Sequence, residues 1–133
     1  MTMSEYLEPY SVQMSFRGEI ADPIDFTRTL LGGIAMLCDQ AGASLIGHIK
    51  CYAHTPLADF HCNLTSLRTG CRCSLDSARP MDGIDLDLVV LVYGLNRDTL
   101  ADLATRQAVT TSREAGVDCM TVREARGQHH EHA

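Results

Sequence analysis

Aromatic residues are scarce in this sequence, and tryptophan is absent altogether. Phe and Tyr together make up 5% of the 133 residues. Stacking platforms for single-stranded nucleic acid or sugars depend on such side chains. Clustered basic charge is lacking as well, because the net charge is −6 and the cationic residues are ten scattered Arg and one Lys, Lys50. A phosphate backbone rewards clustered Lys and Arg through counterion release, so these absences disfavour nucleic-acid binding.

Long apolar runs are also missing, since none approaches the ~20 residues that a membrane-spanning helix needs. The first residues, Met-Thr-Met-Ser-Glu-Tyr-Leu-Glu-Pro, are acidic and lack the basic and apolar regions of a secretion signal. We therefore expect a soluble, cytoplasmic protein. Thiols stay reduced in that compartment, so the six cysteines are expected to be free, with Cys38, Cys51 and Cys62 packed in the core.

The composition is typical of one globular domain. Apolar residues make up 45% of the chain and charged residues 21%, and the length fits a single core. We expect residues 1–126 to form one α+β domain. Residues 127–133 contain His129, His130 and His132, and such a tract can chelate a divalent metal. We favour a plain disordered tail, whose deletion should leave the stability unchanged.

The first part of the chain predicts a strand followed by a helix. Polar and apolar residues alternate over 12–20, which is the period of a half-buried strand. Asp22 and Pro23 then offer an N-cap and a proline at the first helical position. An apolar stripe at helical spacing continues to Ala41, and Gly42 suits the helix end. The Gly32-Gly33 pair inside this helix favours a close-packing seam over a site.

Residues 45–54 and 59–67 predict a β-hairpin with a four-residue loop. Residues whose numbers sum to 113 then lie opposite one another, which places apolar side chains together. The predicted pairs on one face are Ala53–Phe60, Cys51–Cys62, Ile49–Leu64 and Gly47–Ser66. The pairs on the other face are Tyr52–His61, Lys50–Asn63, His48–Thr65 and Ile46–Leu67, the last in the same numerical register.

The second half predicts one long strand and one more helix. Alternation over 84–93 marks the strand, whose second face begins acidic and ends apolar. A helix starts near Asn96 and ends at Gly116, and residues 117–122 read as a short added strand. Cys71-Arg72-Cys73 is either a short edge strand or a reactive loop. The order β-α-β-β-(β)-β-α predicts a two-layer sandwich, in which a mostly antiparallel sheet has both helices on one face.

The polar face of this sheet is the first candidate site. It brings an acid, a base and cations together on a rigid platform, as a small-molecule pocket or enzyme site requires. The candidate ligand-binding residues are Arg17, His48, Lys50, His61 and Asp87. The simpler interpretation is a solvated sheet face, which polar alternation also produces.

Metal binding is a lesser alternative. His48, Cys51 and His54 fall close together in the sequence, and imidazole and thiolate are ligands that zinc and copper prefer. On a strand, however, His48 and His54 share one face while Cys51 points to the other. No Cys-x-x-Cys spacing occurs, so no metal ligands are assigned, and neither a cofactor nor an enzymatic activity follows from the sequence.

The leading hypothesis is a self-associating domain, most simply a homodimer that acts as an interaction or assembly module. Its evidence is the apolar end of the outer sheet face, because exposed apolar groupings usually mark association surfaces. The expected interface residues are Ile46, Leu67, Val89, Leu91 and Tyr93.

Overall fold

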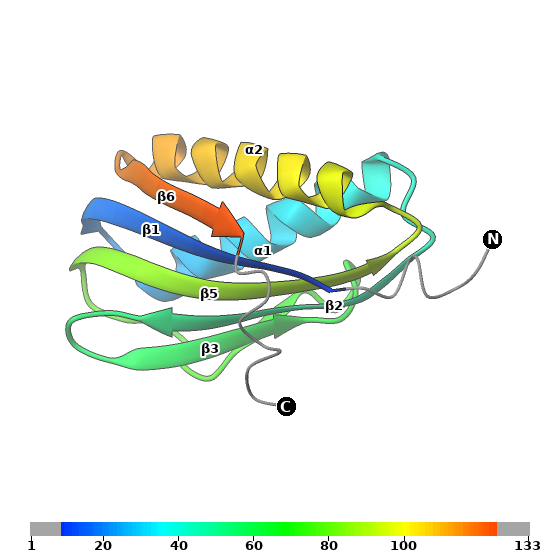
Figure 1. Cartoon of the computed structure of the whole chain (residues 1–133). Helices are drawn as coiled ribbons and strands as arrows, with labels where there is room; N and C mark the ends of the chain where they lie inside the picture. The colour runs from blue at the N-terminus through cyan, green and yellow to red at the C-terminus, as the bar shows by residue number, and fades with distance from the viewer. Residues whose placement is uncertain (1–8, 125–133) are drawn as a thin grey trace, which may run out of the picture.

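The computed structural model describes residues 9–124, which form one six-stranded antiparallel sheet with two helices packed on a single face (Figure 1). This arrangement confirms the predicted α+β two-layer sandwich. None of the helices among these residues is long and apolar enough to cross a membrane. In chain order the elements are β1 (Tyr10–Ile20), α1 (Pro23–Gln40), β2 (Leu45–His54), β3 (Asp59–Leu64), β4 (Cys71–Cys73), β5 (Met81–Tyr93), α2 (Arg97–Ala115) and β6 (Asp118–Glu124).

The strands lie in the order β4-β3-β2-β5-β1-β6. β1 and β2 flank β5, and β5 and β6 flank β1, so α1 and α2 each belong to a split β-α-β unit and the two units interlock. The strands β3 and β4 extend the sheet beyond this core at one edge. The strand β6 corresponds to the short strand predicted at 117–122. It forms the edge of the sheet opposite β4, where it pairs with β1.

Helix α1 begins where the sequence predicts. The Asp22 carboxylate accepts hydrogen bonds from the backbone N–H groups of Ile24 and Asp25, and Pro23 occupies the first turn. Its buried stripe faces the sheet. Gly33 faces α2, where an added Cβ would collide with the Gln107 amide, which confirms the close-packing seam for this glycine.

The hairpin of β2 and β3 has the predicted register, from His54–Asp59 to Ile49–Leu64. The strand β3 ends at Leu64, however, so the expected pairs beyond this point do not form. These incorrect pairs are Gly47–Ser66, His48–Thr65 and Ile46–Leu67.

The strand β2 also contains a bulge at Gly47, in its pairing with β5. Ile46 lies opposite Val92 and His48 opposite Leu91, so Gly47 has no partner of its own on β5. The extra residue reverses the alternation of the strand on its N-terminal side. Ile46 is therefore on the inner face and Leu45, opposite Tyr93, on the outer face.

The hydrophobic core lies between the helices and the inner face of the sheet. The alternate residues Ile84, Leu86, Leu88, Val90 and Val92 of β5 are at most 2% exposed. Phe16 of β1 meets Phe26 of α1 edge to face, with ring centroids 4.9 Å apart. Burial of this face leaves the outer face of the sheet as the surface on which the remaining strand side chains lie.

Candidate functional site

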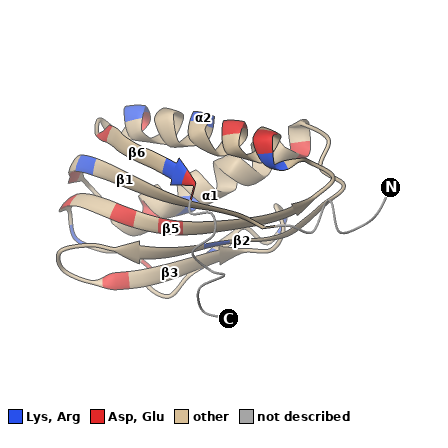
Figure 2. Cartoon of the chain, viewed as in Figure 1, with Lys and Arg blue, Asp and Glu red and all other residues tan. Residues whose placement is uncertain are grey.

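The outer face of the sheet divides into a polar end and an apolar end. The division runs across β5, whose outward residues change from Asp85 and Asp87 to Val89, Leu91 and Tyr93. Figure 2 shows the acidic residues of β5 and β3 and the basic residues of β1 and β6 across the sheet. We call the two parts the polar end and the apolar patch.

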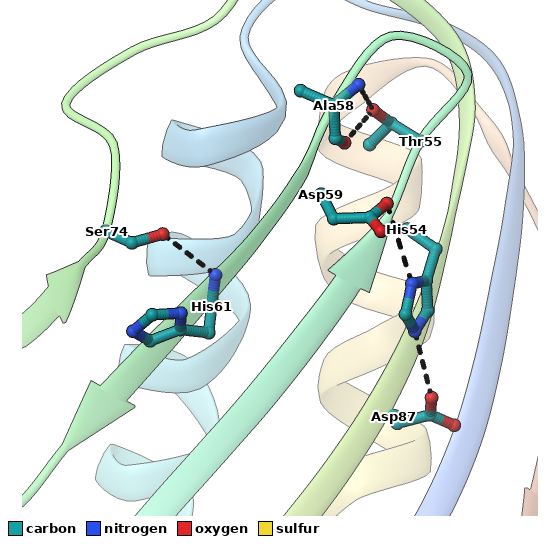
Figure 3. Close-up of polar contacts among 7 residues, drawn as sticks. All are labelled: His54, Thr55, Ala58, Asp59, His61, Ser74 and Asp87. Atoms are coloured by element: carbon teal, nitrogen blue, oxygen red, sulfur yellow. Dashed lines mark hydrogen bonds and ion pairs between the residues drawn. The ribbon is translucent and has the colours of Figure 1, made fainter.

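His54 is the centre of the polar end (Figure 3). Its Nε2 lies 3.2 Å from Oδ2 of Asp87 on β5, and its Nδ1 lies 3.6 Å from Oδ1 of Asp59 on β3. The hydroxyl of Thr55 donates to the carbonyl of Ala58 and accepts from its N–H, which fixes the turn between the two strands. An imidazole with a carboxylate at each ring nitrogen donates to both only when it is protonated.

The hydrogen bonds continue across the sheet from Asp87. Gln13 of β1 donates through its Nε2 to Oδ1 of Asp87 at 3.2 Å, and Arg123 of β6 donates to Oε1 of Gln13 at 2.8 Å. The network thus runs from β3 to β6 through side chains on neighbouring strands. Asp85 is the next outward-facing residue of β5, and its Oδ1 lies 3.2 Å from a guanidinium nitrogen of Arg17 on β1. These groups are about half exposed, so their ion pairs add little to stability and stay accessible to a ligand.

Two shallow grooves open beside this network. One of about 360 Å³ is lined by Gln13, His54, Asp85, Asp87 and Arg123 among others. The second, of about 300 Å³, contains Arg17, His54 and Asp85. Their volumes lie at the small end of the range for ligand pockets, and their walls are rich in hydrogen-bond acceptors. The chemistry suits a small ligand that carries donors or positive charge.

The five predicted ligand-binding residues are not all brought together, although Lys50 and His61 line one small pocket. Arg17 and Asp87 belong to the polar end, whereas Lys50 lies opposite Val89 and His48 opposite Leu91. His61 faces the ring of Tyr52, with the ring centroids 6.0 Å apart.

His54 is the central residue of this candidate site, and the ligand-site prediction left it out. Strand alternation places it on the same face as His48, and its position at the strand end, beside the loop, is visible in the sequence. The contact with Asp87 is diagonal, because Asp87 lies opposite Tyr52 while Asp85 lies opposite His54. Pattern reasoning that pairs only direct neighbours cannot find such a contact.

The apolar patch consists of Leu45, Val89, Leu91 and Tyr93. Leu45 is 60% exposed, and the other three side chains are partly buried. The Tyr93 ring and the Leu91 side chain lie close over Gly47, which has no side chain of its own. A Cβ added at Gly47 would lie 3.1 Å from the ring and 3.3 Å from Leu91 Cγ. Two residues expected in this patch lie elsewhere. Ile46 packs against the core, and Leu67 follows the end of β3.

The cysteines differ from expectation. Cys62 of β3 and Cys73 of β4 form a disulfide, so the prediction that all six thiols are free is wrong. Cys38 and Cys51 are buried free thiols, as expected. Burial raises the pKa of Cys38 to about 11 and raises that of Cys51 further.

One group of residues among those described is close enough to share a metal ion. The sulfur atoms of Cys62, Cys71 and Cys73 all lie within 4.8 Å of one another. His48, Cys51 and His54 do not form such a group within residues 9–124. The tail histidines His129, His130 and His132 lie outside the described residues.

The chain matches no family model, no curated protein and no solved structure.

Proposed function

We propose that the protein is an assembly module that forms a homodimer through the outer face of its sheet. The observation that carries this proposal is the apolar patch of Leu45, Val89, Leu91 and Tyr93, which lies on the face opposite both helices. Apolar side chains gathered on an otherwise polar sheet face are typical of association surfaces. A twofold axis through the patch lets the same residues of two copies meet, which closes the assembly as a dimer.

The polar end supports the same arrangement. When two patches pack together, the grooves around His54 lie at the rim, where polar groups keep contact with water. The charged residues Arg17, Asp85 and Asp87 already have partners within the chain, and Lys50, opposite Val89, is the charged residue that lies beside the patch. The patch is small, and we therefore expect a dimer that dissociates at low protein concentration.

Analytical ultracentrifugation at micromolar concentrations tests the dimer. The wild-type chain should sediment as a dimer, and Leu91→Glu should sediment as a monomer because it places a charge in the patch. The matched control is Val109→Glu on α2, where an exposed apolar residue of the helical layer receives the same charge. The proposal fails if the wild type is a monomer, or if both variants shift the equilibrium equally.

A second candidate function is the binding of a small cationic ligand in the grooves of the polar end. The observation that favours it is the acceptor-rich wall formed by Asp85 and Asp87 with His54. We infer that amine groups would replace the Arg17 and His54 contacts to these carboxylates.

Nuclear magnetic resonance titration with α,ω-diamines tests this second candidate. Saturable shifts should occur at His54 and Asp87 and disappear in Asp87→Asn, whereas Asp102→Asn, which removes a more exposed carboxylate on α2, should bind like the wild type. Shifts spread evenly over all acidic residues would indicate nonspecific charge attraction and would count against a site.

A further inference from the structure

Three sulfur atoms meet at the β4 edge of the sheet, on the face that packs against the helices. The sulfur atoms of Cys71 and Cys73 are 3.9 Å apart, and both lie within 4.8 Å of the Cys62 sulfur. A structural disulfide needs only Cys62 and Cys73. The sulfur of Cys71 has no role in that bond, so the disulfide does not account for the position of this third cysteine.

The strand pairing brings these residues together. Cys62 of β3 lies directly opposite Cys73 of β4, and Cys71 lies opposite Leu64. Because side chains alternate along a strand, Cys71 and Cys73 point to the same face as Cys62. Cys62 is 1% exposed, whereas Cys71 and Cys73 at the sheet edge are only partly buried. Solvent and small ions therefore reach the cluster from the β4 side.

The spacing and charge of the cluster fit a zinc ion. Zinc–sulfur bonds of about 2.3 Å in tetrahedral geometry place sulfur atoms about 3.8 Å apart. The Cys71–Cys73 separation of 3.9 Å already matches this value. Three thiolates with Zn²⁺ carry a net charge of about −1. The guanidinium of Arg28 on α1 interacts with Cys71 and can offset part of this charge.

The surroundings of Cys71 raise the pKa of its thiol overall, so a metal ion has to displace the proton. Burial raises the pKa of the Cys71 thiol, while the Arg28 charge and a backbone hydrogen bond from Asn63 act in the opposite direction. A bound cation would add to these two effects, because metal ions bind the deprotonated thiol and release its proton.

We propose that, in the reduced protein, Cys62, Cys71 and Cys73 bind one Zn²⁺ ion, with water at the fourth position. When Cys62 and Cys73 form their disulfide, two of the three ligands are oxidised and the site does not bind the ion. Two small thiols, such as glutathione, reduce the disulfide: the Cys62–Cys73 bond receives two electrons and two protons, and the two thiols form a disulfide of their own. Zinc binding then releases the three thiol protons. The site does not depend on the dimer proposed above.

Titration of the reduced full-length chain with Zn²⁺ and Cd²⁺ under anaerobic conditions tests the site. Competition with a chromophoric chelator should give one Zn²⁺ per chain, and Cd²⁺ should produce the ultraviolet thiolate-to-metal charge-transfer band. That band reports sulfur ligands and is absent from imidazole sites, so it separates this cluster from the tail histidines.

Cys71→Ser is the decisive variant, because it removes a ligand and leaves the Cys62–Cys73 disulfide intact. We expect it to weaken Zn²⁺ binding at least ~10-fold and to reduce the Cd²⁺ band. Cys119→Ser on β6, another partly buried free thiol, is the control and should bind like the wild type. Equal binding by Cys71→Ser and wild type, or an unchanged Cd²⁺ band in the oxidised protein, would overturn the proposal.

Discussion

Gly32 and Gly33 are neighbours in helix α1 but face different surroundings. An added Cβ at Gly32 meets nothing within 4 Å, whereas at Gly33 it would meet the side-chain amide of Gln107 on α2. That amide donates to the hydroxyl of the buried Thr111 at 3.0 Å. The glycine that matters for packing is therefore Gly33, where the two helices approach closely.

We expect Gly32→Ala to raise the free energy of unfolding by about 0.5–1 kcal/mol, because alanine loses less backbone entropy than glycine in a helix. The free energy of unfolding of Gly33→Ala should be about 1 kcal/mol lower than that of Gly32→Ala, because the Gln107 side chain must move and lose its hydrogen bond to Thr111. Urea unfolding measures both values. In the Gln107→Ala background the two substitutions should become equivalent, and a persistent difference would contradict the seam.

Cys38 links stability to alkaline pH in the reduced protein. Burial raises its pKa from 9.0 to about 11, so the folded chain retains a proton that the unfolded chain has lost. Stability from this residue is therefore complete below pH 9 and decreases as the pH rises toward 11, by about 3 kcal/mol in total.

The comparison with Cys38→Ala isolates this contribution. The alanine variant has no thiol at this position to titrate, so the difference in unfolding free energy between wild type and variant should narrow between about pH 9 and about pH 11. Urea unfolding under reducing conditions at each pH measures it. A difference that stays constant over this range would mean that the Cys38 thiol ionises equally in both states.

At the scale of elements, local signals predict most of the structure. Asp22 with Pro23 marks the start of α1, and Asn96 and Gly116 mark the two ends of α2. The hairpin register follows from apolar pairing across a short loop. The prediction fails where one residue changes the phase, because the alternation was continued through Gly47, although a glycine inside a strand is a signal for a bulge. Consequently Ile46 was placed on the wrong face.

The cap of α1 also holds a distant loop. Besides Ile24 and Asp25, Oδ1 of Asp22 accepts a hydrogen bond from the backbone N–H of Ala78 at 3.2 Å. Asp22→Ala should therefore lower the free energy of unfolding by about 2 kcal/mol, at the upper end of the cost of losing a cap. Asp22→Asn keeps the acceptor and should recover most of the loss. Thermal unfolding of the wild type and the two variants measures the loss of stability. Equal losses in both variants would show that the negative charge of Asp22, and not its hydrogen bonds, stabilises the cap.

At the scale of the whole molecule, the sequence predicts the layers but not the order of the strands. The alternation of apolar and polar residues within each single strand is enough to predict that one face of the sheet is covered. The neighbours of a strand depend on non-local pairing, which is why the position of β6 beside β1 and the contact of His54 with Asp87 emerge only from the fold. The cysteine cluster is hidden for the same reason, because Cys62 reaches Cys71 and Cys73 only through the β3–β4 pairing.

The proposed dimer links stability to protein concentration. If the apolar patches of two copies pack together, folding and association are coupled, and the melting temperature should rise by about 3 °C for each tenfold increase in concentration. Leu91→Glu removes the association and should melt at a temperature independent of concentration, while Val109→Glu should keep the wild-type dependence. Differential scanning calorimetry over two decades of concentration measures this slope. A wild-type melting temperature that does not change with concentration would contradict the dimer and leave the grooves around His54, lined by Asp85 and Asp87, as the remaining candidate on this face.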